Sequence, residues 1–315
     1  LANTTANNNT AVGQDALTAN TTGTSNTSVG SYALDANTTA SYNTAVGADA
    51  LTANTTGTKN TGIGYEALEG TTTGSYNTCV GSNSLKSNTT GVSNNALGQA
   101  ALASNTTGSN NVAIGLDALN AQQTANDNTA VGYFALKANT TGAYNVGVGA
   151  SALAANTTAN NNTAIGYLAL KTNTTANNNT AVGYETLTTN STGVQNTALG
   201  SQSLEYLQTG NDNTGLGYIT LHSASGSQNT AVGSRALQDM TTGDDNTAVG
   251  YHALHTNTTA SDNTALGSHA LYLNTTGFNH TAVGYEALKA NTTSNSNVAV
   301  GYRSMLANTT GGANT

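Results

Sequence analysis

Large apolar residues recur along this chain with a fixed period, at every 17th position, and the positions between them hold mostly Asn, Thr, Ala and Gly. The stretch at residues 43–47, Asn-Thr-Ala-Val-Gly, returns unchanged at residues 128–132 and 246–250, and looser copies fill the gaps. A short period held along a whole chain is typical of stacked coils, in which each repeat packs on its neighbours. We number the repeat from its first to its seventeenth position, with Asn43 first and Lys59 last.

The repeat is regular from end to end. Copies begin at Asn9 and at every 17th residue up to Asn213. The next step is one position shorter and leads to Asn229, and the regular spacing then continues to Asn297. This gives 18 units with one deletion, which lies around residues 223–225. We expect the deletion to shorten one loop and the stack to continue past it.

The columns of the repeat differ in how strictly they are kept. The fifth position is Gly in all 18 units, the fourth is Val, Ile or Leu, and the ninth is Leu except for Met305. The fourteenth is Thr in every complete unit, and the third and eighth hold only small residues. One Val and one Leu per repeat cannot form the apolar stripe of a helix, and frequent Gly and Asn-Thr pairs disfavour helices. The pattern therefore predicts short strands separated by turns.

The sequence thus predicts an all-β fold, a parallel β-solenoid (β-roll or β-helix) of about 18 coils with a 17-residue repeat. In the strand expected at residues 44–46, Thr and Val share one face and Ala takes the other. Stacking aligns each column into a row, so we expect two apolar core rows, from the fourth and ninth positions. The core rows are represented by Val46, Ile63, Val80, Val131, Leu51, Leu68, Leu85 and Leu136.

Two polar or small columns have structural roles in this interpretation. The fifth-position Gly is expected where the chain turns with positive φ or where backbones approach closely. These turn residues include Gly47, Gly64, Gly81 and Gly132. We expect the first-position Asn side chains to cap turns and to bond their neighbours in the coils above and below.

Composition and charge narrow the range of partners. Charged residues make up 7% of the chain, the net charge is −8, and only 7 residues are Lys or Arg. No basic stripe is therefore available for nucleic acid. No apolar run is long enough to span a membrane. The single cysteine, Cys79, fills the small third column, and we interpret it as a buried small residue rather than a nucleophile.

We expect residues 1–315 to form a single repeat rod, roughly 85 Å long at about 4.8 Å per coil. The sequence starts and stops within a unit, which predicts an uncapped segment of a longer fibre. Uncapped coils expose strand edges, and exposed edges favour end-to-end pairing.

Few residues favour chemistry, and we predict no catalytic, cofactor-binding or metal-binding residues. Residues 62–67 fit a Gly-x-Gly-x-x-Ala dinucleotide fingerprint, but that motif needs a following helix, which the repeat excludes. His252 and His269 occupy the seventh position of consecutive units and could share a metal ion. Two solvated side chains are the simpler interpretation. Asp49 and Glu66 are neighbours of the same kind, and we interpret them as surface charges.

Tyrosine forms one candidate binding row. Eight of the 14 Tyr residues lie at the sixth position, just after the turn Gly, where we expect them to be half exposed. Such rings could stack on sugars or on a partner fibre, or simply on one another, as strand residues do. The row consists of Tyr65, Tyr133, Tyr167, Tyr184, Tyr218, Tyr251, Tyr285 and Tyr302.

The Asn-Thr-Thr runs offer a second candidate row. If one Thr of each pair points outward, the stack displays a regular array of hydroxyl and methyl groups, as ice-binding solenoids do. If the strict Thr column points inward, it satisfies backbone groups instead. The same runs have the form of glycosylation acceptors, which we interpret as a by-product of the turn.

Two units, at residues 111–115 (Asn-Val-Ala-Ile-Gly) and 297–301 (Asn-Val-Ala-Val-Gly), resemble a known motif. It is the Asn-Ser-Val-Ala-Ile-Gly motif of the head domains of YadA-type trimeric autotransporter adhesins, and similar arrays occur in phage tail-fibre-like proteins. The resemblance implies a left-handed parallel β-roll, three chains around an axis, and a head that binds host surface components. It also implies inner-core positions for Val46, Ile63 and Val80, and close packing at the small residues Ala45, Gly62 and Cys79. The family's units are typically shorter than these.

We therefore expect a non-enzymatic fibre, extracellular or on a cell or virion surface. It would be an adhesin head or shaft that self-associates as a homotrimer and binds a host surface or glycan, without a cofactor. Two alternatives stay open. One is an ice-binding solenoid that works as a monomer through its Thr arrays, and the other is a structural filament whose subunits join end to end.

Overall fold

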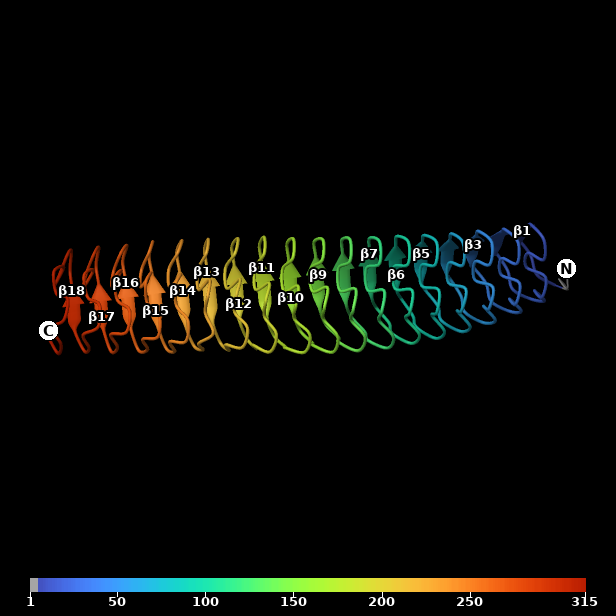
Figure 1. Cartoon of the computed structure of the whole chain (residues 1–315). Coiled ribbons are helices and arrows are strands. Elements are labelled where there is room, and N and C mark those ends of the chain that lie inside the picture. The colour runs from blue at the N-terminus through green and yellow to red at the C-terminus, as the bar shows by residue number, and fades with distance from the viewer. Residues whose placement is uncertain (1–4) are drawn as a thin grey trace. The chain divides into compact units, whose positions relative to one another are not determined.

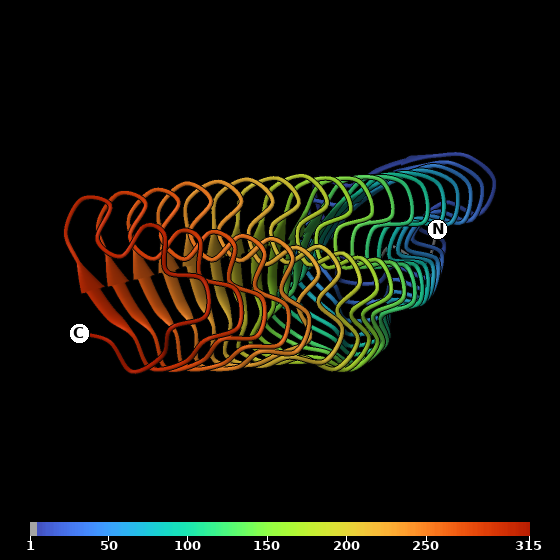
Figure 2. The ribbon, with the colours of Figure 1, turned by 60° about the vertical axis from the view of Figure 1, so that its left-hand side comes forward.

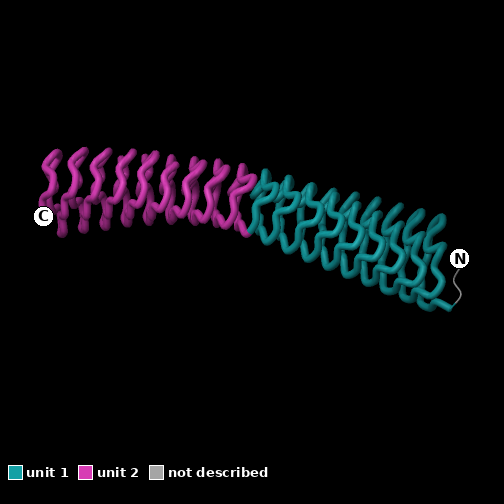
Figure 3. Tube along the Cα trace, turned by 90° about the horizontal axis from the view of Figure 1, so that it is seen from below, with its two compact units in different colours: residues 1–160 teal, residues 161–315 magenta. Residues whose placement is uncertain are grey.

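A computed structural model describes residues 5–315, and the chain divides into two compact units, residues 1–160 and 161–315 (Figure 3). The described residues form 18 strands, joined by turns, and contain no helix. Each coil contributes one three-residue strand, and the strands of successive coils within a unit pair in parallel (Figure 1). The predicted fold class, an all-β parallel β-solenoid, is confirmed. The single rod over residues 1–315 stays a prediction.

Each unit contains nine of the strands. Unit 1 has β1 (Thr10–Val12), β2 (Thr27–Val29), β3 (Thr44–Val46), β4 (Thr61–Ile63), β5 (Thr78–Val80), β6 (Asn95–Leu97), β7 (Val112–Ile114), β8 (Thr129–Val131) and β9 (Val146–Val148). Unit 2 has β10 (Thr163–Ile165), β11 (Thr180–Val182), β12 (Thr197–Leu199), β13 (Thr214–Leu216), β14 (Thr230–Val232), β15 (Thr247–Val249), β16 (Thr264–Leu266), β17 (Thr281–Val283) and β18 (Val298–Val300). In both units the strands line one side of the coil and the turns make up the rest (Figure 2).

The strands pair in register, so equal columns lie side by side. Val46 of β3 pairs with Ile63 of β4, and the same register holds along each unit. The one shortened step of the repeat falls between β13 and β14, where Thr214 still pairs with Thr230. The expected loop shortening with an unbroken stack is therefore confirmed.

The fifth-position Gly residues have both features expected of them, a positive φ and a close approach to the backbone of the next coil. Gly132 has a φ of 135°, and Gly47, Gly64 and Gly81 share this conformation. A Cβ added to Gly132 would also lie 2.6 Å from the carbonyl oxygen of Gly149 in the next coil. Only Gly meets both demands, which is why the column has no exception.

Three other positions of the repeat also have a left-handed backbone. In the coil of β3 these are Asp49, Leu51 and Lys59, with φ values of 59°, 54° and 58°. Residues with side chains avoid this region because Cβ crowds the backbone. Hydrogen bonds between coils hold the conformation: the Leu51 N–H donates to the Ala67 carbonyl at 3.0 Å. The same bond recurs along the stack, so neighbouring coils fix one another's turns.

The ninth-position leucines form the core of each unit. Leu51, Leu68, Leu85 and Leu136 have 0% of their surface exposed, as predicted. The prediction for the fourth position is wrong. Ile63 and Val80 expose 38% and 37% of their surface, and Val46 and Val131 are half-buried. The fourth-position side chains point away from the core, and this correction applies to Val46, Ile63, Val80 and Val131.

The thinness of the coil explains this correction. Thr and Val do share one face of the strand, but the third-position residue is the one that points inward, as the buried Ala45, Gly62 and Cys79 show. A Cβ added to Gly62 would lie 3.6 Å from Leu51 Cδ1 and 3.1 Å from the Ala67 carbonyl oxygen. The space between the strand and the leucine row therefore admits a small side chain and excludes Val.

Buried Asn side chains complete the interior. At the first position, the Asn43 side-chain oxygen accepts the Asn60 N–H at 2.9 Å, and the Asn43 amide donates to the Gly57 carbonyl at 2.9 Å. At the twelfth position, the Asn54 amide donates to the same carbonyl at 3.0 Å and to the Asn37 side-chain oxygen at 3.0 Å. The predicted Asn ladder is confirmed, and it lies inside the coil, where buried polar groups need such partners.

Candidate functional site: exposed rows of the coils

The outward side of the strands carries the second and fourth positions, which we call the outer sheet face. The second position is mostly Thr and the fourth is Val, Ile or Leu. Four consecutive fourth-position residues of unit 1 each expose more than a third of their surface. They are Ile63, Val80, Leu97 and Ile114. In-register pairing places these side chains next to one another, so they form a continuous apolar stripe.

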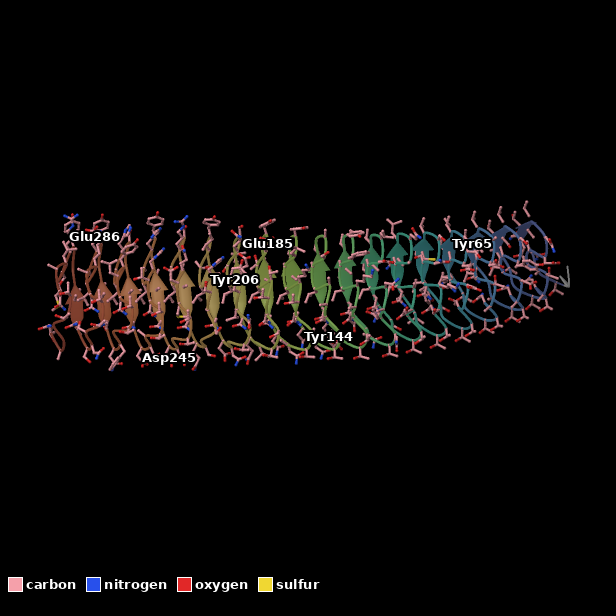
Figure 4. The ribbon with its side chains drawn as sticks, viewed as in Figure 1. Tyr65, Tyr144, Glu185, Tyr206, Asp245 and Glu286 are labelled. Carbon is pink, nitrogen blue, oxygen red and sulfur yellow. The ribbon has the colours of Figure 1, made fainter. Side chains whose placement is uncertain are left out.

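No strand of the described chain contains a charged residue. Charges that face outward from a sheet normally oppose association with a second sheet. Here the charged residues lie in the turns at the two rims of the coil. Tyr65 marks one rim of unit 1 and Tyr144 the other, and Glu286 and Asp245 mark the corresponding rims of unit 2 (Figure 4). The outer sheet face thus carries apolar side chains, Thr hydroxyls and the single amide of Asn95, and no charge.

The sixth-position Tyr row is half exposed, as expected, with exposed fractions from 43% for Tyr285 to 70% for Tyr302. Where two Tyr residues occupy consecutive coils, their rings stack. The ring centres of Tyr167 and Tyr184 are 5.6 Å apart, and those of Tyr285 and Tyr302 are 5.5 Å apart. These pairs agree with the simpler interpretation, stacking on neighbours, and they leave the outer ring faces and edges accessible.

The two Thr columns have opposite roles. The thirteenth-position hydroxyl bonds within the stack: Thr55 Oγ1 donates to the Thr72 carbonyl at 3.1 Å. The fourteenth-position Thr, which is the strict column, is exposed in the coils of unit 1, as Thr56 and Thr107 illustrate. The strict column therefore points outward. The Asn of each run points inward; Asn54 is 0% exposed, so its amide is not accessible for glycosylation in the folded chain.

One rim pairs the seventh position with the tenth. Glu66 forms an ion pair with Lys86 of the next coil, and Asp117 pairs with Lys137 at 3.0 Å. Glu286 accepts hydrogen bonds from Lys289 and Arg303, and these lower the pKa of its carboxyl to about 2. Glu66 is therefore an ion-pair partner, which agrees with its interpretation as a surface charge.

In the coils of β15 and β16, the same rim holds aromatic and imidazole rings. The His252 ring centre lies 4.6 Å from that of His255 and 5.3 Å from that of His269. Tyr272 lies 5.2 Å from both His255 and His269. The expectation of two solvated His side chains is wrong for His252, which is only 8% exposed, because the neighbouring rings cover it.

The remaining candidates are structural. Cys79 is fully buried, and burial raises the pKa of its thiol to about 12, which makes it unreactive as predicted. The fingerprint at residues 62–67 contributes an inward strand residue, Gly62, and a turn residue, Gly64, with no following helix. No three His, Cys, Asp or Glu side chains in the described chain are arranged, as they stand, to hold a metal ion.

The chain matches no protein-family model and no curated protein sequence. The resemblance to adhesin head repeats and tail-fibre-like repeats therefore stays a prediction. Within residues 5–315, no helix has the length and apolar character needed to cross a membrane.

Proposed function

We propose that this chain is a non-enzymatic module of an extracellular adhesive fibre, whose copies associate as a homotrimer through the outer sheet face. The observation that carries the proposal is the exposed, uncharged apolar stripe on that face. Large contiguous apolar patches on a protein surface mark interaction sites.

A second copy of the same chain is the occupant that fits best. The stripe repeats at strand spacing, so it is complementary to another stripe of the same period. It also lacks the outward charges that prevent sheets from associating. A partner with the same repeat buries Val, Ile and Leu side chains along its whole length, whereas a globular partner covers only a few coils.

The association is tested by sedimentation equilibrium of the chain and of two matched double variants. Ile114→Lys with Val131→Lys places charges on the outer sheet face, and Thr107→Lys with Thr124→Lys places them on the fourteenth-position row. All four positions are outward, so both variants should keep the β-rich circular dichroism of the parent. We expect a trimer for the parent and the Thr variant, and a monomer for the Ile and Val variant. A monomeric parent would rule the proposal out.

Adhesion is the second half of the proposal, and the half-exposed Tyr rings at the rim support it. Aromatic faces that are accessible to solvent can stack on apolar faces of sugars. Glycan binding by the trimer should fall when Tyr167 and Tyr184 are both changed to Ser. The matched control changes Tyr42 and Tyr76, which lie at the other rim, and should leave binding intact.

Ice binding is the second candidate function, and the outward fourteenth-position Thr row favours it. An exposed Thr at every coil of unit 1 gives a regular array of hydroxyl and methyl groups at strand spacing. Thermal hysteresis at micromolar protein would support this candidate, and its absence would eliminate it. The same two double variants separate the surfaces: the Thr107 and Thr124 changes should abolish hysteresis, and the Ile114 and Val131 changes should not.

A further inference from the structure

We propose that His252, His255 and His269 form a binding site for a divalent transition-metal ion such as Zn²⁺. The site lies in unit 2 and joins two consecutive coils, because His252 and His255 belong to the coil of β15 and His269 to the coil of β16. It is independent of the proposed fibre function.

The first support is an unsatisfied buried side chain. His252 is more than nine-tenths buried, and neither Nδ1 nor Nε2 has a hydrogen-bond partner. A buried polar group without a partner is destabilising, so native structures normally supply one, and a bound ion is one such partner. On the same rim Glu286 binds Lys289 and Arg303. Asn83 Oδ1, Gln238 Oε1 and His255 Nδ1 also lack a partner, but in His252 both ring nitrogens lack one.

The second support is the spacing of the rings. Two imidazoles that bind one Zn²⁺ at about 2.0–2.1 Å have ring centres roughly 5 Å apart. His252 lies 4.6 Å from His255 and 5.3 Å from His269. The rings are stacked, with interplanar angles of 9° and 29°, so ligation requires rotation of the side chains.

The third support is the set of groups around the two outer histidines. Ser268 Oγ lies 2.9 Å from His269 Nδ1, whereas Asp239 Oδ2 lies 3.5 Å from His255 Nδ1, which has no hydrogen-bond partner. Metal-binding histidines usually hold their second nitrogen against a partner such as Ser268, which orients the ring. In His269 this arrangement leaves Nε2 for the metal.

The charge environment keeps the ligands unprotonated. Burial, followed by the neighbouring His255, His269 and Arg235, lowers the pKa of His252 to about 4. The ring is therefore neutral at neutral pH, as metal binding requires. Asp239 is the nearby group that opposes the positive charge of Arg235. Imidazole nitrogen selects Zn²⁺, Cu²⁺ or Ni²⁺ over Ca²⁺ and Mg²⁺.

The test is isothermal titration of the full chain, without a histidine tag, with ZnCl₂ at pH 7.5, and with CaCl₂ as the negative control. We expect one Zn²⁺ per chain and no Ca²⁺ binding. H252Q and H269Q should each weaken Zn²⁺ binding at least about tenfold. H222Q is the matched control because His222 is a rim imidazole of the same unit that already pairs with Glu205 at 3.1 Å. It should leave Zn²⁺ binding unchanged.

A second measurement needs no variant and so does not depend on variant folding. Zn²⁺ should shift the ring-nitrogen resonances of His252, His255 and His269 and leave those of His222 and His280 in place. The melting temperature should rise with Zn²⁺, because the ion binds the folded state across two coils. Absence of Zn²⁺ binding, Zn²⁺ binding by H252Q and H269Q as tight as that of the parent, or shifts confined to His222 and His280 would each overturn the proposal.

Discussion

The ninth-position and fourth-position rows contain the same kind of side chain in opposite surroundings. Leu136 lies inside the coil with no exposed surface, and Val131, five residues earlier in the same coil, lies on the outer sheet face. The inner row is almost always Leu, whereas the outer row alternates freely among Val, Ile and Leu. A close-packed interior accepts one shape, and an exposed surface accepts several. Variation in size within an apolar column is therefore a sign of exposure.

The largest effect should come from truncating the two rows in turn. Leu136→Ala should destabilise unit 1 by roughly 2–5 kcal/mol, because it leaves a cavity in the core. Val131→Ala should cost less than about 1 kcal/mol in the monomer, because its side chain is already partly in water. Urea unfolding followed by circular dichroism measures both. Equal losses of unfolding free energy in the two variants would mean that the fourth-position side chains are buried as fully as the ninth-position leucines.

The second-largest loss of stability should come from substituting the turn glycine that lies between these two rows. Gly132→Ala should cost roughly 2–4 kcal/mol, because the new Cβ meets the Gly149 carbonyl oxygen and the φ of 135° is unfavourable for Ala. Thr141→Ala is the control, because the Thr141 side chain is exposed and the change adds no atom. Hydrogen exchange of the neighbouring amides would locate the damage. A larger loss for Thr141→Ala would contradict this account of the turn.

A buried Asn of the inner ladder can be compared with an exposed Asn in the same way, through the stability lost when each is changed to Ala. Asn128→Ala should cost about 1–3 kcal/mol, because the buried Asn145 N–H loses the Asn128 Oδ1 acceptor at 2.9 Å and the Gly142 carbonyl loses one of its two amide donors. Asn126→Ala removes an exposed acceptor and should cost less than half as much. Thermal unfolding of the two variants measures the difference. Similar melting temperatures would argue against a stabilising role for the inner ladder.

The smallest effect concerns His280, which occupies an Asn position of the inner ladder. Its Nδ1 accepts the Asn297 N–H at 3.1 Å and its Nε2 faces the Ser294 carbonyl at 2.6 Å, so the neutral ring fits and the protonated ring does not. Burial accordingly lowers the pKa of His280. The unfolded chain binds a proton near pH 6.5 and the folded chain only at lower pH, so stability falls as pH drops below about 6.5.

His280→Asn restores the ladder residue and should reduce this loss. The melting temperature, measured from pH 8 to pH 5, should fall less in the variant than in the parent. His252, whose pKa is also lowered, contributes a drop in the same direction, so the remaining slope in the variant serves as an internal control. An unchanged slope would show that protonation of His280 has no part in the pH dependence.

Much of the fold could be predicted from the sequence because a strict period is a direct record of stacking. The leucine row, the turn Gly and the Asn ladder each follow from one strictly kept column. The inward side of the strand could not be predicted from hydrophobicity, which favours burying Val131 over Ala130. The informative signal was the restriction of the third column to small residues, because it reports how little space separates the strand from Leu136.

The candidate sites were predictable to different degrees. Half-exposure of Tyr65 and its row follows from its place after the turn Gly. The outer sheet face was missed because its apolar residues were assigned to the core. His255 was missed as a neighbour of His252 because the left-handed backbone between them, at Leu254 and His252 itself, brings the seventh and tenth positions together. Nothing in the spacing alone indicates that contact.

Three non-glycine positions of each coil have the left-handed conformation. This feature limits how the sequence can gain or lose copies of the repeat. Each such residue is disfavoured by about 1–2 kcal/mol when considered alone, and the bonds from adjacent coils hold it in place. Each coil therefore depends on its neighbours, and we expect copies to be added or lost as whole coils joined at equivalent positions, with smaller changes confined to turns such as the one shortened near residues 223–225. Removing residues 43–59 should yield a shorter, well-folded protein, whereas removing half as many should disrupt the coils on both sides.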